Sequence, residues 1–245
     1  MSLTALLDPA VHLAYLAVTH LAATLPGWAS PGDRTALAVV LVTWAVRAAL
    51  LPLALSAARA RVSSAGLAPE ISRLQRRHAG DPARLGQELR RVYREAGTGP
   101  FAAILPTLAQ LPVISTMYRL VVVPVVAGAP NVVLTAVALG VPLGGHWPAL
   151  LGAAGVFSGT VLALLGLLLM LACLAWISSR QVALAAASAP AAAASAPQVP
   201  GAVARLMRLL PFATVGFAVV APPAVGIYLL ASTAWTVTER ALLPS

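Results

Sequence analysis

Arg47 is the residue of this sequence whose position most directly implies a chemical role. It lies near the middle of residues 35–57, an apolar stretch that is long enough to cross a hydrocarbon core of about 30 Å. A central arginine costs about 2.5–3.5 kcal/mol on insertion scales unless water or a partner meets it. None of the seven acidic residues lies in the interior of a predicted span, so a carboxylate partner is missing. We therefore favour a cation in a water-filled cavity over an arginine bonded to the carbonyls of a neighbouring helix.

The residue groups that usually carry out catalysis are missing from the sequence. It contains no phosphate-binding loop, no His/Glu spacing typical of a zinc site and no nucleophile beside a base. The single cysteine, Cys173, lies in an apolar run, which excludes a thiol metal cluster or a disulfide framework. We therefore predict that the chain is not an enzyme and that it uses no metal and no cofactor.

The composition is that of an integral membrane protein. Of the 245 residues, 60% are hydrophobic and only 9% are charged, and the mean hydropathy is +0.88. A soluble core of this size could not bury so much apolar surface. The net charge of +9 comes entirely from arginine, because no lysine occurs, and most of it lies in one loop. This concentration argues against a general nucleic-acid surface.

The hydrophobic pattern predicts an all-α membrane protein with a five-helix transmembrane bundle. Residues 4–24, within an N-terminal segment 1–30, carry polar side chains along one helical face. That pattern is typical of a helix in the membrane interface, and a spanning helix is the alternative. Residues 31–245 form the predicted membrane core. Its spans are residues 35–57, 101–123, 158–178 and two short helices within 205–240, joined in part by an outer loop at 124–157 and a flexible linker at 179–204.

Residues 58–97 form a strongly basic segment between the first two spans. It contains nine arginines and four acidic residues. Apolar residues recur at helical spacing on both sides of a break at His78. Asp81 can cap a helix that begins at Pro82. We predict a cytoplasmic hairpin of two amphipathic helices, with the N-terminus outside and the C-terminus in the cytoplasm. The hairpin either fixes topology alone or contacts anionic lipid, a ribosome or a targeting factor.

Several short motifs follow one another in a defined order along the chain. They are Thr43-Trp44-Ala45-Val46-Arg47 before Leu51-Pro52, then Pro69-Glu70-Ile71, Tyr93-Arg94-Glu95, Leu105-Pro106 with Gln110-Leu111-Pro112, and Pro223-Ala224-Val225-Gly226-Ile227-Tyr228. In this order they resemble the YidC-type membrane protein insertases of bacteria, in their short Gram-positive-like form. The sequence departs from that family in its short C-terminal tail and in Leu229, where the family usually has tryptophan.

The resemblance implies an energy-independent insertase and chaperone of the bacterial plasma membrane. In such a protein, a hydrophilic groove open to cytoplasm and lipid accepts the polar flank of a nascent membrane protein while its apolar segment enters the bilayer. The implied partners are nascent membrane proteins, the lipid bilayer, a ribosome or targeting factor at residues 58–97, and the Sec translocon. The residues that we expect to bind substrate in this groove are Arg47, Thr43, Gln110, Tyr228 and Ser232.

Two other function classes compete with this interpretation. A small channel or solute transporter could use Arg47 to select ions or solutes, but the sequence shows no inverted repeat and no matched pair of broken helices. An enzyme that acts on lipid-linked substrates would need a catalytic group that the sequence lacks. Solute flux through empty liposomes would favour the channel, and insertion of a small test protein would favour the insertase.

Overall fold

The computed structural model describes residues 3–27, 29–78, 80–97, 105–153, 155, 157–187 and 201–242. This part of the chain is mostly helical, as expected for an all-α membrane protein, and it also contains two small antiparallel hairpins. The elements are α1 (Leu3–Thr24), α2 (Pro31–Ala49), α3 (Leu51–Arg77), α4 (Pro82–Glu95), α5 (Leu105–Leu120), β1 (Val125–Val126), β2 (Ala129–Pro130), α6 (Val132–Thr135), β3 (Val137–Ala138), β4 (Val141–Pro142), α7 (Trp147–Ala153), α8 (Gly159–Ala187), α9 (Gly201–Val220) and α10 (Pro223–Leu242).

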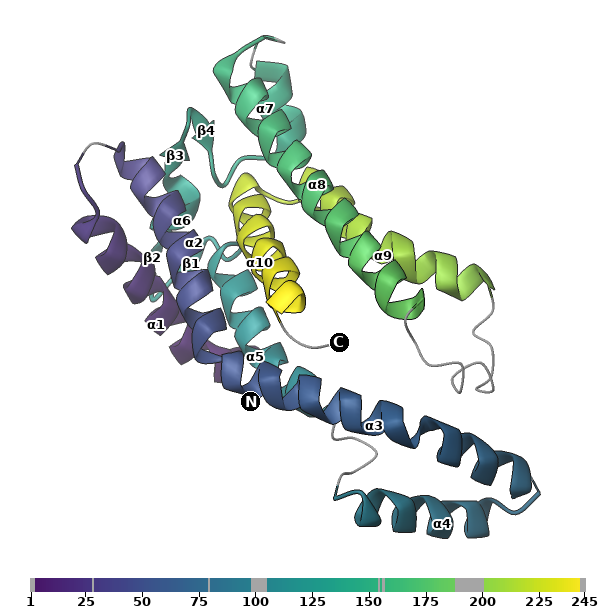
Figure 1. Ribbon diagram of the computed structural model, residues 1–245. Coiled ribbons are helices and arrows are strands. Elements are labelled where there is room, and N and C mark those ends of the chain that lie inside the picture. Colours follow the sequence, from purple (N-terminus) through teal and green to yellow (C-terminus); the bar gives the residue numbers. More distant parts are fainter. Residues whose placement is uncertain are drawn as a thin grey trace.

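Helix α10 occupies the middle of the helical assembly. It packs against α2 and α5 on one side and against α8 and α9 on the other, as Figure 1 shows. Helix α1 lies beside α2 and α5 and contributes Val11, Ala14 and Val18 to the buried interior. Whether α1 also lies in the membrane interface, as its polar face suggests, stays a prediction.

The main core forms where α1, α2, α5 and the first half of α10 meet. Its fully buried side chains include Val18, Leu120 and Val225, which come from three different helices. Gly32 at the start of α2 allows the close approach of β3, because a Cβ added there would lie 1.8 Å from the Val137 carbonyl oxygen. The Asp33 carboxylate accepts hydrogen bonds from the Ser30 hydroxyl (2.7 Å) and the Leu139 amide (2.7 Å). These contacts fix the start of α2 against the outer segment.

The first predicted span is bent rather than straight. Helix α2 ends at Ala49 and α3 begins at Leu51, and the two axes differ by 48°. Pro52 lies in the first turn of α3, where its ring removes one backbone donor and clashes with the preceding turn. Helix α3 then runs without interruption to Arg77, so the span and the first helix of the predicted hairpin form one element.

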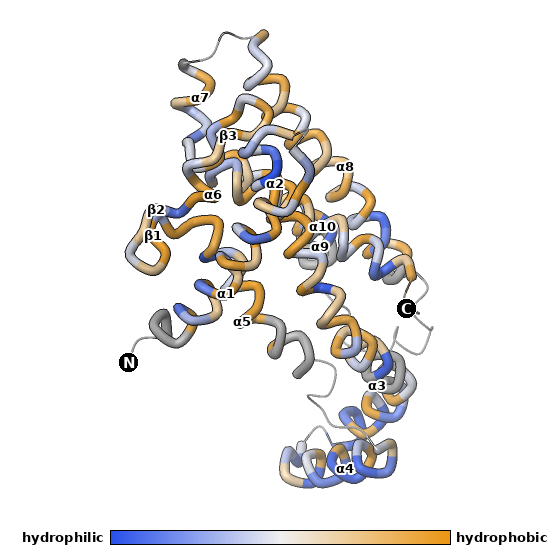
Figure 2. The backbone as a smooth tube through the Cα atoms, turned by 90° about the vertical axis from the view of Figure 1, so that its left-hand side faces the viewer, coloured by the Kyte–Doolittle hydropathy of each residue, from blue (hydrophilic) through white to orange (hydrophobic). Residues whose placement is uncertain are grey.

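Helices α3 and α4 form the basic hairpin that the sequence predicts. The Asp81 carboxylate accepts a hydrogen bond from the Arg84 amide (3.0 Å), and Pro82 occupies the first turn of α4. Arg91 forms ion pairs with Glu88 (2.9 Å) and Glu95 (3.7 Å) along the exposed face of α4. Figure 2 shows that the hydrophilic residues gather on this hairpin, away from the more apolar bundle.

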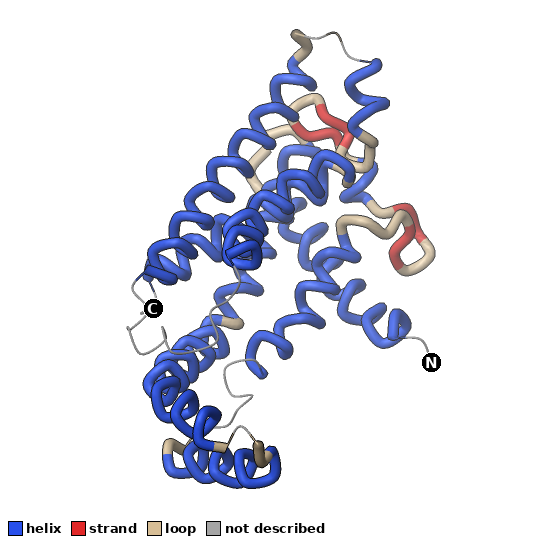
Figure 3. Tube along the Cα trace, turned by 90° about the vertical axis from the view of Figure 1, so that its right-hand side faces the viewer, coloured by secondary structure: helices blue, strands red, loops and turns tan. Residues whose placement is uncertain are grey.

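The outer segment between α5 and α8 is more ordered than the predicted loop at 124–157. It contains the hairpins β1–β2 and β3–β4, which Figure 3 draws in red, away from the helices α3 and α4 at the bottom of the view. Asn131 organises it from a fully buried position: its amide donates to the carbonyls of Leu120 (2.7 Å) and Val123 (2.9 Å), and its oxygen accepts from the Val133 amide (3.0 Å). The Asn131 side chain therefore joins the end of α5 to α6.

The described helices differ in how clearly they could cross a membrane. Residues Gly159–Leu184 of α8 are long and apolar enough to do so alone, and the bent pair Pro31–Ala49 and Leu51–Arg59 qualifies if it is counted as one span. Residues Arg208–Val220 form a shorter apolar helix. Residues 179–187, which belong to the predicted linker at 179–204, continue α8, and residues 188–200 lie outside the described residues.

Candidate functional site

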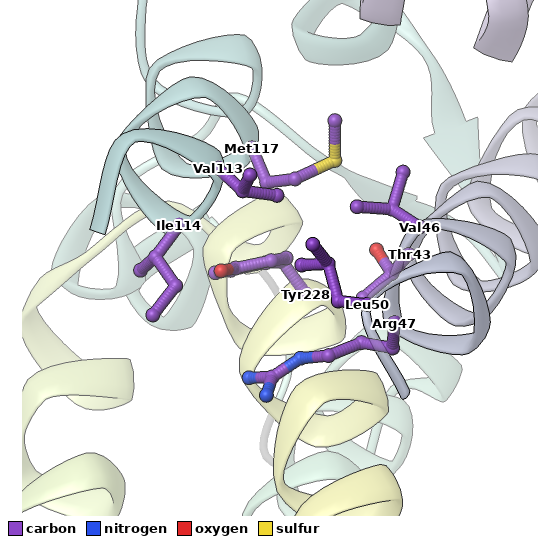
Figure 4. A pocket seen from close by; sticks show the side chains of 8 residues that line it. All are labelled: Thr43, Val46, Arg47, Leu50, Val113, Ile114, Met117 and Tyr228. Carbon is purple, nitrogen blue, oxygen red and sulfur yellow. The ribbon is translucent and has the colours of Figure 1, made fainter. Parts of the chain in front are cut away.

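A small open pocket surrounds Arg47 between α2, α5 and α10. Its empty space of about 270 Å³ includes open space at its mouth, and only about 10 Å³ of it is wide enough for a water molecule. The polar groups that line it are Thr43 and Arg47 from α2 and Tyr228 from α10, whereas α5 contributes an apolar wall. Figure 4 shows the Tyr228 side chain between Arg47 and this wall. The full lining is Thr43, Val46, Arg47, Leu50, Val113, Ile114, Met117 and Tyr228.

The Arg47 side chain crosses from α2 to α10 and is half-buried. Its Nη2 donates a hydrogen bond to the Ser232 hydroxyl oxygen over 2.6 Å. Among the described residues, no carboxylate forms an ion pair with Arg47. A neutral hydroxyl satisfies one guanidinium donor but leaves the positive charge uncompensated. The site therefore has the electrostatic character of a receptor for negatively charged or strongly polar groups.

The other predicted site residues differ in how they meet Arg47. Tyr228 is buried in the pocket wall with 5% of its surface exposed. Thr43 is buried as well, and its hydroxyl donates to the Val39 carbonyl (2.7 Å), so only its oxygen lone pairs remain available to a ligand. Gln110 belongs to α5, but its side chain lies outside the described residues. The structure thus brings Thr43, Arg47, Tyr228 and Ser232 together.

A second contact between α2 and α10 was not predicted from the sequence. The Trp44 indole nitrogen donates a hydrogen bond to the Ala231 carbonyl oxygen over 3.1 Å. Trp44 precedes Arg47 by three residues, a spacing that places both side chains on one side of α2. Ala231 and Ser232 are likewise consecutive on α10. The two hydrogen bonds join α2 to α10 at neighbouring positions. The three-residue spacing of Trp44 and Arg47 was the sequence signal from which this paired contact could have been predicted.

A further ion pair ties the N-terminal helix to the end of α5. Arg119 donates to the Asp8 carboxylate over 2.7 Å, and 24% of the arginine side chain is exposed. Arg119 lies near the end of the predicted span 101–123, from which a long side chain can reach the membrane interface. Its contact with α1 instead gives the polar face of that helix a definite partner within the protein.

The amino-acid sequence matches that of a known family of membrane proteins. The defining pattern of the family described as 60Kd inner membrane protein matches residues 29–244, which is most of the chain. The chain belongs to this family. Family membership supports the sequence-based resemblance to YidC-type insertases and places the chain among membrane proteins.

Individual members with curated names are similar over shorter stretches. The membrane protein insertase YidC of Treponema pallidum is 34% identical over 96 residues, which is 39% of this chain and 14% of the relative. YidC of Clostridium tetani is 33% identical over 89 residues, which is 36% of this chain and 40% of the relative. The chloroplastic ALBINO3-like protein 1 of Arabidopsis thaliana is 39% identical over 82 residues, which is 34% of this chain and 16% of the relative. The matches thus span less than half of each relative.

Proposed function

We propose that this protein is a membrane protein insertase and that the pocket around Arg47 receives the polar flank of its client. The observation that carries the proposal is a half-buried arginine that bridges α2 and α10 and meets a hydroxyl, with no carboxylate paired to it in the described part of the chain. The names of the two YidC relatives, both membrane protein insertases, support the same function.

The pocket suits a client segment that is partly polar and partly apolar. Arg47 offers a positive charge and Thr43, Tyr228 and Ser232 offer hydroxyl oxygens, whereas Val113 and Met117 on α5 offer an apolar surface. A polar group moved into hydrocarbon without a hydrogen-bond partner loses several kcal/mol. A polar stopping place part-way across the bilayer lowers that barrier, and no covalent step is needed. Gln110, on the same helix as the apolar wall, is a further proposed contact.

The proposed topology has five spans, with the N-terminus outside and the C-terminus in the cytoplasm of a bacterial cell. The arginine-rich hairpin of α3 and α4 supports this orientation, since basic loops stay on the cytoplasmic side. Gln75→Cys, made in a chain with Cys173→Ala, tests it in intact cells. A membrane-impermeant thiol reagent added outside should leave position 75 unlabelled until the membrane is opened. Labelling of intact cells would reverse the topology.

The hairpin of α3 and α4 is the proposed recruiting element. Its exposed arginines suit ribosomal RNA, a targeting factor or anionic lipid, and the nascent membrane protein would reach the pocket from this side. The Sec translocon is a further proposed partner, which the resemblance to YidC-type insertases implies.

Reconstitution separates an insertase from a channel. The purified protein is placed in liposomes, and protease protection measures the insertion of a single-span client, with solute efflux from the same liposomes as the comparison. We expect insertion well above that in protein-free liposomes and no added efflux. Efflux without insertion would favour a channel in which Arg47 selects the solute, and it would refute the insertase proposal.

A further inference from the structure

A second cavity lies between α2, α8 and α10, beside the contact that Trp44 and Arg47 make with α10. We name it the lateral groove. It has about 800 Å³ of empty space, including open space at its mouth, and its walls are apolar. Three of its side chains are exposed: Trp44 by 41%, Met170 by 56%, and Cys173. The lining is Val40, Trp44, Met170, Cys173, Leu174, Leu230, Ala231 and Ala234.

The lateral groove has no free polar group among these lining side chains that could fix a peptide. The Trp44 indole nitrogen is the one strong donor in the lining, and it is already bonded to the Ala231 carbonyl. A ligand inside the groove must therefore bind by apolar contact and shape alone. A hydrocarbon chain meets this requirement, and in a membrane it is the material that surrounds the mouth of the groove.

A positive charge lies beyond one end of the lateral groove. Arg180 follows Cys173 by seven residues, so it lies about two turns, or about 10 Å, further along nearly the same face of α8. Its guanidinium carbon lies 4.4 Å from the centre of the Trp176 ring. Among the described residues, no carboxylate is paired with Arg180. Tryptophan together with arginine is typical of the level of lipid headgroups.

The position of Arg180 along α8 agrees with the level of the lipid headgroups. The apolar stretch of α8 that could cross a membrane ends at Leu184, four residues after Arg180. At 1.5 Å per residue, Arg180 lies about 6 Å from that end, where phosphates and glycerol groups begin. Cys173 and Met170 lie deeper, at the level of the acyl chains.

We propose that the lateral groove binds one anionic phospholipid, with its phosphate on Arg180 and one acyl chain between α2, α8 and α10. The chain would run from Trp176 toward Met170, with the Trp44 ring on its other side. A lipid in the groove would also cover Trp44 where it contacts α10. This proposal depends on residence in a membrane and is independent of the insertase activity.

The native Cys173 provides the test, because it is the only cysteine in the chain and it lines the lateral groove. The protein is placed in nanodiscs of phosphatidylcholine with or without phosphatidylglycerol, and the rate of its reaction with N-ethylmaleimide is measured. We expect phosphatidylglycerol to slow the reaction at least threefold. Arg180→Gln should abolish this protection, whereas Arg208→Gln, an exposed arginine on α9, should keep it. Inorganic phosphate should give none.

Lipid retention after transfer to mild detergent provides the second measurement. By native mass spectrometry, the unchanged protein should keep one phosphatidylglycerol. Ala234→Phe should reduce the retained fraction at least fivefold because its ring fills the lateral groove, and Ala213→Phe on the exposed face of α9 should not. The proposal is overturned if Ala234→Phe retains as much lipid as the unchanged protein, if Arg180→Gln keeps the Cys173 protection, or if phosphate alone reproduces that protection.

Discussion

Replacing Arg47 tests the proposed pocket most directly. Arg47→Ala removes the positive charge and the bond to Ser232, whereas Arg47→Lys keeps the charge on a flexible stem. If the guanidinium attracts acidic residues in client tails, alanine should reduce their insertion strongly and lysine should retain much of it. Clients with neutral tails should lose little with either variant.

The size of the effect follows from the exposure of the site. Arg47 is half-buried, so an effective dielectric constant of about 20 applies; a carboxylate about 6 Å from the charge then gains about 2.8 kcal/mol, and one at about 12 Å gains about 1.4 kcal/mol. These energies correspond to about hundredfold and tenfold changes in an equilibrium. We therefore expect Arg47→Ala to lower the equilibrium capture of acidic-tail clients between tenfold and a hundredfold relative to neutral-tail clients.

The assay compares two single-span clients that differ only in the charge of the N-terminal tail. Their capture by the protein and their insertion yield into liposomes are measured for the unchanged protein, Arg47→Ala, Arg47→Lys and Ser232→Ala, with the melting temperature of each in detergent. Ser232→Ala is the matched control because it removes the contact to α10 and keeps the charge. Equal loss for both clients that follows the melting temperature, with lysine as damaging as alanine, would show that Arg47 only braces α2 against α10.

Three further predictions concern the outer segment and the hairpin. Gly32→Ala should lower the melting temperature in detergent clearly, because its Cβ would meet the Val137 carbonyl, whereas Gly27→Ala, which has no neighbour within 4 Å, should change it little. Asn131→Ala removes the hydrogen-bond partner of up to three backbone groups and should lower the free energy of unfolding by roughly 3 kcal/mol. Thermal or denaturant unfolding would show this as an earlier loss of structure. Deletion of residues 60–96 should impair client capture in cells while the protein stays in the membrane; unchanged capture would reduce the hairpin to a topology signal.

Local sequence signals predicted the hairpin and its cap, because they depend on neighbouring residues. Asp81 and Pro82 start α4 through a hydrogen bond that spans three residues. The basic charge of the hairpin was equally visible, since it is a property of composition. The sequence likewise identified Arg47 and Ser232 separately, but their contact joins residues 185 positions apart. Only the packing of α2 on α10 determines that distance.

The outer segment could not be predicted in the same way. The β1–β2 and β3–β4 turns place Ala127 and Leu139 at φ 51°, a conformation that such residues rarely adopt. Gly128 and Gly140 follow them and are typical of such turns, but the residues before them obscured the signal. The Leu139 amide is held by the Asp33 carboxylate, which lies 106 residues away, so tertiary contact overrides the local preference. The bend at Leu50 was also missed because the apolar run continues across it.

Leu50 has a mechanical consequence, since it belongs both to the bend and to the pocket around Arg47. Helix α3 extends from it for 27 residues, which makes a lever arm of about 40 Å. A rotation of about 10° at this fulcrum would move the far end near Arg77 by about 7 Å. Conversely, a load on the hairpin would be transmitted as a torque to the lining of the pocket. A particle that grips the hairpin could therefore alter the width of the pocket without touching it.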